Sequence, residues 1–228
     1  MPVIAFANPK GGSGKTTSAL LLATELAGKG ATVTVIDADP EQWIMKWAAL
    51  PGRPDTLKAI SNREEDGLVD AIEAAQAASQ FVIVDLEGTA NAMVTDAIGM
   101  ADLVVIPIQG SAMDAQGGAK MLRLIRNQEK ITKRTINYGM LLTRTSAAVM
   151  SRSLRDVVEQ LRGSKVTLFS TPIVERAAFR DLFAYGGTLA SMEAGQVSNL
   201  DKAVENAQAF AGEVLTALHI VKPSRKVA

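Results

Sequence analysis

Apolar runs rich in β-branched residues alternate along the chain with longer segments of helical periodicity. The strand-like runs occupy residues 3–7, 32–36, 81–85, 103–108 and 136–142. The helix-like segments cover residues 15–28, 41–49, 64–78, 113–130, 147–162, 176–185 and 200–218. Apolar strands separated by helices are typical of a parallel sheet that is buried on both faces. The pattern therefore predicts the α/β class, with one mostly parallel, twisted sheet and helices on both of its faces.

Carboxylates directly follow two of these strands. The second strand ends at Asp37 and the third at Asp85, while a glycine-rich loop follows the first. In open α/β sheets, ligands bind outside the carboxyl ends of the strands. We therefore expect the loop and the two aspartates to meet at one crevice.

Composition narrows the possible chemistry. With 228 residues, 47% of them hydrophobic, the chain fits one domain, which we place at 1–221 with a flexible tail over 222–228. It has no cysteine, which excludes iron–sulfur clusters and thiolate sites, and its single histidine, His219, argues against histidine-based catalysis. No apolar run reaches the roughly 18 residues of a membrane-spanning helix. A cytoplasmic protein without a membrane anchor is expected.

The glycine-rich loop lies between the first strand and the first helix, which is the context of a P-loop. Its residues are Lys10, Gly11, Gly12, Ser13, Gly14, Lys15, Thr16 and Thr17. Glycines let successive backbone N–H groups point at phosphate oxygens, and the helix adds the positive end of its dipole. Lys15 would neutralise the β- and γ-phosphates, and the Thr16 hydroxyl would bind Mg²⁺. We therefore expect ATP and Mg²⁺ at this loop.

An additional lysine makes the loop more specific. The common P-loop pattern has glycine six residues before the conserved lysine, where this chain has Pro9, and Lys10 follows. The loop thus resembles the deviant Walker A box of the ParA/MinD superfamily of P-loop NTPases. The resemblance implies an ATP hydrolase that forms a homodimer, in which Lys10 reaches the ATP of the other subunit. A second cation near the γ-phosphate would stabilise the charge that develops during phosphoryl transfer, as an arginine finger does.

Asp37-Ala38-Asp39-Pro40 is similar to the second box of that superfamily. The similarity implies that Asp37 belongs to the Mg²⁺ shell and that Asp39 positions the attacking water. The implied catalytic residues are therefore Lys10, Lys15 and Asp39. The alternative is structural, because isolated carboxylates at these positions would also cap the helix that begins near residue 41.

The strand Phe81 to Asp85 has the Walker B form, which makes Asp85 a candidate Mg²⁺ ligand. The superfamily usually continues with a Thr/Pro/Gly-rich switch, whereas this chain continues with Leu86, Glu87 and Gly88. We expect the Glu87 carboxylate to point into solvent.

The resemblance extends over most of the chain and implies contacts with the base. Thr171-Pro172-Ile173 resembles the turn near adenine, so Pro172 and Ile173 are candidate base contacts. Thr143 lies where the superfamily often has an asparagine near the base, and Arg144 is an alternative stacking group.

Charge is unevenly distributed although the chain is neutral overall. Residues 1–119 carry 7 basic and 15 acidic side chains, residues 120–165 carry 11 and 3, and the remainder carries 6 and 6. A basic block of this kind indicates either a polyanion-binding surface or solvated helix faces. Because ParA-like dimers bind DNA non-specifically, the candidate DNA contacts are Arg152, Arg155, Arg162, Lys165, Arg176 and Arg180.

The implied function is an ATP-dependent switch that associates with the nucleoid and partitions a plasmid, a chromosome or a protein cargo. Lys10 follows the first residue too closely for a preceding helix-turn-helix domain, so we expect a separate partner to recognise the specific DNA site. This ParB-like adaptor would also stimulate hydrolysis. Three alternatives stay open: a VirC-like accessory ATPase of conjugative transfer, a MinD-like membrane-associated ATPase, and a small-molecule synthetase on the same fold.

Overall fold

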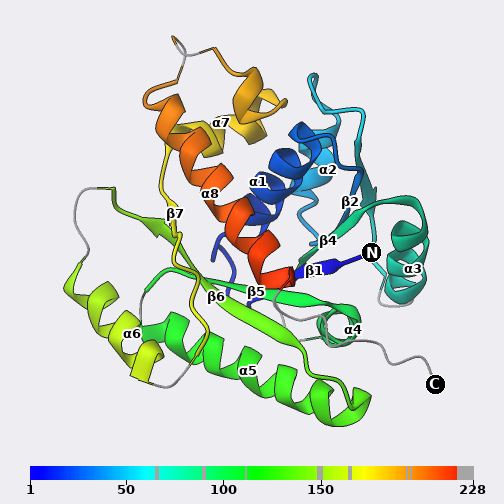
Figure 1. Cartoon of the computed structure of the whole chain (residues 1–228), viewed down its shortest axis with the longest axis vertical. Helices are drawn as coiled ribbons and strands as arrows, with labels where there is room; N and C mark the ends of the chain where they lie inside the picture. Colours follow the sequence, from blue (N-terminus) through cyan, green and yellow to red (C-terminus); the bar gives the residue numbers. More distant parts are fainter. Residues whose placement is uncertain are drawn as a thin grey trace.

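The computed structural model describes residues 1–64, 67–88, 91–110, 112–147, 151–163, 166–193, 195 and 197–219. Its centre is a seven-stranded sheet in the order β3-β2-β4-β1-β5-β6-β7, in which every neighbouring pair is parallel (Figure 1). The strands are β1 Val3–Phe6, β2 Val33–Ala38, β3 Leu57–Ser61, β4 Phe81–Leu86, β5 Leu103–Ile108, β6 Asn137–Thr145 and β7 Ile173–Val174.

Helices cover both faces of the sheet. They are α1 Lys15–Gly28, α2 Trp43–Ala48, α3 Leu68–Ala78, α4 Ala92–Met100, α5 Ala112–Thr132, α6 Arg152–Gly163, α7 Ala177–Tyr185 and α8 Leu200–His219, with a short 3₁₀ helix, η1, at Leu189–Ser191. Helices α1, α2, α7 and α8 enclose one apolar core, and α3 to α6 enclose the other. The predicted α/β class and its helix-covered parallel sheet are confirmed.

The pleat of the strands divides their side chains between the two cores. In β1, Ile4 and Phe6 join the core beneath α1 and α8, while Val3 and Ala5 join the core beneath α3 to α5. All four side chains are buried. This two-sided burial explains why the strand is apolar throughout rather than alternating.

The sheet order places the predicted motifs together. Strand β1 lies between β4 and β5, so the chain crosses over on opposite sides of β1 and opens a crevice at the carboxyl ends of the strands. The loop after β1 begins in this crevice. The register of β2 and β4 pairs Asp37 with Asp85 directly. The convergence of the loop and both aspartates on one edge of the sheet follows from this topology.

Besides the short η1, three elements have no counterpart in the predicted pattern. Strand β3 is an edge strand whose residues are mostly half-buried or exposed, so it lacks the apolar run of the inner strands. Helix α4 follows Asn91, whose side chain accepts a hydrogen bond from the Val94 N–H at 3.0 Å and so caps the helix. Strand β7 has only two residues, which is too short for a periodic signal.

Within the described residues, no helix combines the length and the apolarity that crossing a membrane requires. The proposed tail at 222–228 lies outside the described residues.

Candidate functional site: a P-loop cavity with an adjoining apolar pocket

The P-loop connects β1 to α1 and depends on glycine at two left-handed positions. Gly12 has φ 72° and Gly14 has φ 96°, a region that side chains other than glycine rarely adopt. Gly14 precedes the first residue of α1, and a Cβ atom added there would lie 3.1 Å from the Cβ of Thr143. The backbone conformation and the approach of β6 therefore both require glycine at position 14.

Side chains from neighbouring strands take up the carbonyl oxygens of the loop. The Thr143 hydroxyl donates to the Ser13 carbonyl oxygen at 2.6 Å, and the Gln109 amide donates to the Gly12 carbonyl oxygen. Asn8 accepts from the Lys10 N–H at 2.9 Å and donates to the Pro107 carbonyl oxygen. A loop that turns its N–H groups toward an anion needs its carbonyl groups satisfied on the outer side. Thr143 and Gln109 provide that support, and Asn8 holds the start of the loop through the Lys10 N–H. The spacing of the motif reveals none of these three contacts.

A cavity of about 610 Å³ lies over the loop. Its walls include the loop residues from Gly11 to Thr17, together with Asp39, Glu41, Trp43, Glu87, Gly88, Arg144, Arg180 and Phe183. Lys15 and Thr16 thus face the same space as Asp39, which comes from the segment after β2, whereas Asp37 and Asp85 are buried and are not among the described residues that line it. Lys10 is not among the described residues that line it. The Ser13 hydroxyl is buried without a hydrogen-bond partner among the described residues.

Burial dominates the electrostatics of the charged groups beside the P-loop. Asp85 is fully buried, which raises its pKa to about 8, although the nearby Thr16 hydroxyl and the Lys15 ammonium favour the charged form. Asp37 and Asp39 add to the increase. Burial also lowers the pKa of Lys15, against the attraction of Asp85, Asp39 and Glu87.

The carboxylate of Asp85 has the properties of a ligand for a hard cation. Within the described residues neither of its oxygens makes a hydrogen bond of good geometry, and such a buried acceptor is costly unless something satisfies it. The Thr16 hydroxyl lies beside it. Because Mg²⁺ prefers oxygen ligands and usually binds through one or two carboxylates, the residues present fit this ion.

Asp37, within β2, and Asp39, directly after this strand, accept hydrogen bonds from backbone N–H groups. Asp37 is buried, and its carboxylate accepts hydrogen bonds from the Met45 N–H at 3.0 Å and the Asp39 N–H at 3.3 Å. Burial raises the pKa of Asp37, and these backbone hydrogen bonds oppose the increase. Asp39 accepts from the Glu41 N–H at 2.9 Å. The structural alternative therefore describes a contact of Asp37, which binds an N–H in the first turn of α2, whereas the N–H that Asp39 binds precedes this helix.

Glu87 is half-buried and lines the cavity, so the expectation that it points into solvent is wrong. Its carboxylate accepts a long hydrogen bond from the Asn91 amide at 3.5 Å and raises the pKa of Lys15. Asn91, the N-cap of α4, thus holds Glu87 near the loop. The sequence of strand β4 alone does not predict this contact.

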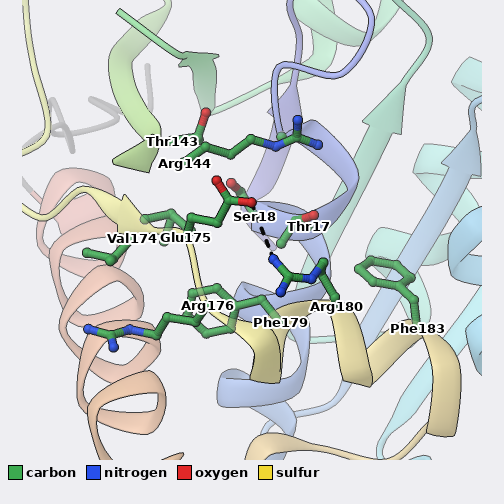
Figure 2. Close-up of a pocket in the computed structure, with 12 residues that line it drawn as sticks. Thr17, Ser18, Thr143, Arg144, Val174, Glu175, Arg176, Phe179, Arg180 and Phe183 are labelled. Carbon is green, nitrogen blue, oxygen red and sulfur yellow. Dashed lines mark hydrogen bonds and ion pairs between the residues drawn. The ribbon is translucent and has the colours of Figure 1, made fainter. Parts of the chain in front are cut away.

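A smaller pocket of about 340 Å³ adjoins the cavity (Figure 2). The two share Gly14, Thr17, Arg144, Arg180 and Phe183 and therefore form one continuous site. The remaining walls of the pocket are Ser18, Thr143, Ile173, Val174, Glu175, Arg176 and Phe179. Apolar side chains of Ile173, Val174, Phe179 and Phe183 combine here with charged and hydroxyl groups, and such a mixed lining suits a small organic ligand with polar substituents.

The predicted base contacts occupy different positions around this pocket. Ile173 lines it, whereas the carbonyl oxygen of Pro172 accepts a hydrogen bond from Asn206 at 2.7 Å. Thr143 also lines it, with its hydroxyl committed to the P-loop. Arg144 has φ 50° at the point where the register of β6 and β7 shifts. A non-glycine residue in this conformation costs on the order of 1–2 kcal/mol, so the bulge holds Arg144 at the pocket against its backbone preference.

An aromatic pair, exposed Trp43 and half-buried Phe183, forms the other rim of the cavity. Trp43, at the start of α2, is 45% exposed and meets the ring of Phe183 edge-on at 6.5 Å between centroids. The Lys46 ammonium lies 4.3 Å from the centre of the Trp43 ring. No motif points to these residues, because their role arises from the packing of α2 on α7.

The candidate DNA contacts fall on two different parts of the molecule. Arg152, Arg155 and Arg162 share the exposed side of α6, opposite its buried apolar residues. Arg176 and Arg180 lie at and near the start of α7, on the other face of the sheet, and both line the smaller pocket. Arg180 forms an ion pair with Glu175 at 3.3 Å. The Arg176 side chain points away from this ion pair (Figure 2). Lys165 lies outside the described residues.

Comparisons with known proteins agree with this arrangement. The family described as the CobQ/CobB/MinD/ParA nucleotide binding domain matches residues 4–189. Protein ParA of Rhizobium radiobacter is 41% identical over 211 residues, which cover 92% of this chain and 95% of the relative. Maintenance of carboxysome distribution protein A of Halothiobacillus neapolitanus is 25% identical over 186 residues, covering 80% and 84%. The solved structure of apo McdA from Cyanothece superposes with a TM-score of 0.76 at 19% identity, covering 92% of this chain and 99% of that one.

Proposed function

Because the chain belongs to the CobQ/CobB/MinD/ParA nucleotide-binding family, we propose that it is an ATP-hydrolysing switch that dimerises with ATP, binds DNA non-specifically and partitions a cargo. The observation that carries this proposal is the continuity of the P-loop cavity with the apolar pocket across Gly14 and Thr17. The cavity suits a triphosphate and the pocket suits a nucleoside. The proposed location is the cytoplasm, on the nucleoid.

The residues in and beside the cavity would divide the work of phosphoryl transfer. Lys15 would neutralise the phosphates, while Thr16, Asp85 and Asp37 would hold Mg²⁺. The ion would supply positive charge that offsets the charge of the phosphate groups. Asp39 faces the same cavity and would orient the attacking water. Lys10 would complete the site of a second copy of the chain.

The arginines of α6 would supply the DNA contacts. Three guanidinium groups on one exposed helix side can approach successive phosphates without reading bases. This surface lies on the opposite face of the sheet from α7 and α8. Binding of DNA at α6 would therefore leave the Trp43 rim of the cavity available to a ParB-like adaptor that stimulates hydrolysis.

A membrane-positioning function receives less support from the described part of α8. Ala203, Ala207, Phe210, Ala211 and Val214 are buried in the core rather than presented to a lipid surface. An amphipathic membrane anchor needs such a face to be free.

Size-exclusion chromatography of Asp39→Ala with ATP and Mg²⁺, with and without duplex DNA, tests the proposal. Without water positioning, ATP should persist, so a dimer that co-elutes with DNA is expected. Asp55→Ala, in an exposed turn, is the matched control and should behave as the unmodified chain does. A monomer at saturating ATP would contradict the proposed dimer.

Lys10→Ala separates the role of the additional lysine from that of Lys15. The variant should bind ATP normally and lose hydrolysis stimulated by the adaptor, whereas Lys15→Ala should lose nucleotide binding itself. Normal stimulated turnover by Lys10→Ala, measured as phosphate release, would disprove the action of Lys10 across the dimer.

A further inference from the structure

Strand β7 is the edge of the sheet and also a wall of the smaller pocket. Ile173 and Val174 form the whole strand, and both line the pocket. On its inner side the strand meets β6 with a shifted register. Its outer side has no further strand in the sheet order, so backbone N–H and C=O groups there need other partners. A two-residue strand with half of its ladder missing is a weak wall unless something else holds it.

Helix α8 supplies the missing partners through Asn206. The Asn206 side-chain oxygen accepts from the Val174 N–H at 3.0 Å, and its amide nitrogen donates to the Pro172 carbonyl oxygen at 2.7 Å. This two-point pairing reproduces what the backbone of an adjacent strand would offer. Asparagine has a low helix propensity, so its presence at position 206, inside the alanine-rich helix α8, indicates a role other than helix formation.

Glu213, two turns along the same helix, holds the segment that leads into β7. Its two carboxylate oxygens accept from the Ser170 N–H at 2.6 Å and the Thr171 N–H at 2.8 Å. Two side chains of α8 thus bind four backbone groups between residues 170 and 174. Charge-assisted bonds of this kind are among the stronger hydrogen bonds in proteins.

Apolar packing fixes α8 relative to the strand. Phe210 lies between the two polar residues along the helix, is fully buried, and meets Phe169 edge-on at 6.2 Å between centroids. Ile173 belongs to the same core. The helix therefore holds Asn206 and Glu213 from a rigid position.

We propose that Asn206 and Glu213 are positioning residues that set the pocket wall at β7 and thereby the affinity for the nucleoside part of the nucleotide. The inference rests on the proposed function and extends it to residues that do not line the pocket. It predicts a specific division: loss of the anchor weakens binding of the nucleoside and leaves binding of phosphate groups at the P-loop unchanged, because that loop is held by Asn8, Gln109 and Thr143.

Calorimetric titration with two probes tests this division in one Mg²⁺ buffer. ADP engages the P-loop and the pocket, whereas inorganic pyrophosphate engages the P-loop alone. For Asn206→Ala we expect the Kd of ADP to rise about tenfold, since two hydrogen bonds to the wall are lost, and that of pyrophosphate to change less than about twofold. Glu205→Ala, an exposed neighbour on α8 paired with Lys202, should change neither.

A second variant protects the test against loss of folding. Asn206→Asp keeps the acceptor for the Val174 N–H but places an acceptor against the Pro172 carbonyl oxygen, so it should also weaken ADP selectively. Circular dichroism establishes that each variant is folded. Unchanged ADP affinity in a folded variant, or equal weakening of both probes, would overturn the positioning role. An unmodified chain that binds pyrophosphate but not ADP would instead refute the proposed nucleotide function, and this inference with it.

Discussion

Thr143 and Thr145 provide a matched test of how β6 supports the P-loop. Both threonines are buried on the same strand, but their hydroxyls differ: Thr143 donates to the Ser13 carbonyl oxygen, while Thr145 meets no hydrogen-bond partner within the described residues. Valine has nearly the same shape as threonine and suits a strand. The two substitutions to valine therefore remove chemically identical groups in different surroundings.

The expected effects have opposite directions. Thr143→Val leaves a buried carbonyl oxygen unsatisfied, so the free energy of unfolding should fall by about 1–3 kcal/mol. Thr145→Val removes a hydroxyl whose burial nothing offsets, so it should be neutral or stabilising by up to about 1 kcal/mol. If about 1 kcal/mol of loop positioning is lost in Thr143→Val, the affinity for ADP should also fall about fivefold.

Equilibrium unfolding in urea and calorimetric titration with ADP measure both quantities. Both proteins should unfold with the same denaturant dependence, so that midpoints report stability directly. Equal changes in stability for the two variants would refute the reasoning, because they would show that the contact with Ser13 contributes nothing. Loss of stability in Thr143→Val without loss of ADP affinity would restrict the contact to a role in folding.

Three further predictions concern the site and the basic helix. Asp85 has a raised pKa, so the folded chain holds the carboxyl proton more tightly than the unfolded chain does. In EDTA without nucleotide, the thermal stability of the unmodified chain should therefore fall relative to that of Asp85→Asn as the pH rises from about 4 to about 8. Parallel pH profiles of the two proteins would contradict this. Gly14→Ala should abolish measurable ADP binding through the contact with β6, whereas Gly28→Ala, at the end of α1 with open space around it, should bind normally in the same titration. Arg152→Glu combined with Arg155→Glu should weaken binding to duplex DNA and leave ADP affinity unchanged. The slope of log K for DNA against log salt concentration should become shallower by about two. Fluorescence anisotropy at several salt concentrations measures this slope, which will be unaltered if α6 does not contact DNA.

The part of the molecule that the sequence predicted well is the part encoded by local pattern. The inner strands are continuous apolar runs because helices cover both of their faces, and the P-loop needs its glycines for reasons confined to a few neighbouring residues. That Asp37 and Asp85 both lie at the carboxyl edge follows once a parallel sheet is assumed, whereas their direct pairing in the register of β2 and β4 is a finding of the structure. These features depend on period and composition, which a single sequence contains.

The missing part depends on contacts between distant segments. Strand β7 is a strand only because β6 and α8 hold its two residues, and Glu87 faces the P-loop because the cap of α4 lies beside it. Arg176 and Arg180 have helical spacing, yet Arg176 has the extended backbone of the α7 N-cap and Arg180 pairs with Glu175, so their side chains diverge. Nothing in the local sequence encodes these partners.

The two tryptophans of α2 give the chain an optical probe at its own site. Trp47 is fully buried and donates its indole N–H to the Gly187 carbonyl oxygen at 3.1 Å, so its emission should be shielded from aqueous quenchers. Trp43, by contrast, lies open at the cavity rim, one residue beyond Gln42, whose amide binds the Asp37 and Asp39 carbonyl oxygens. Iodide quenching therefore reads Trp43 selectively, and the occupancy of the cavity becomes visible in unlabelled protein as a change in the quenchable fraction of fluorescence.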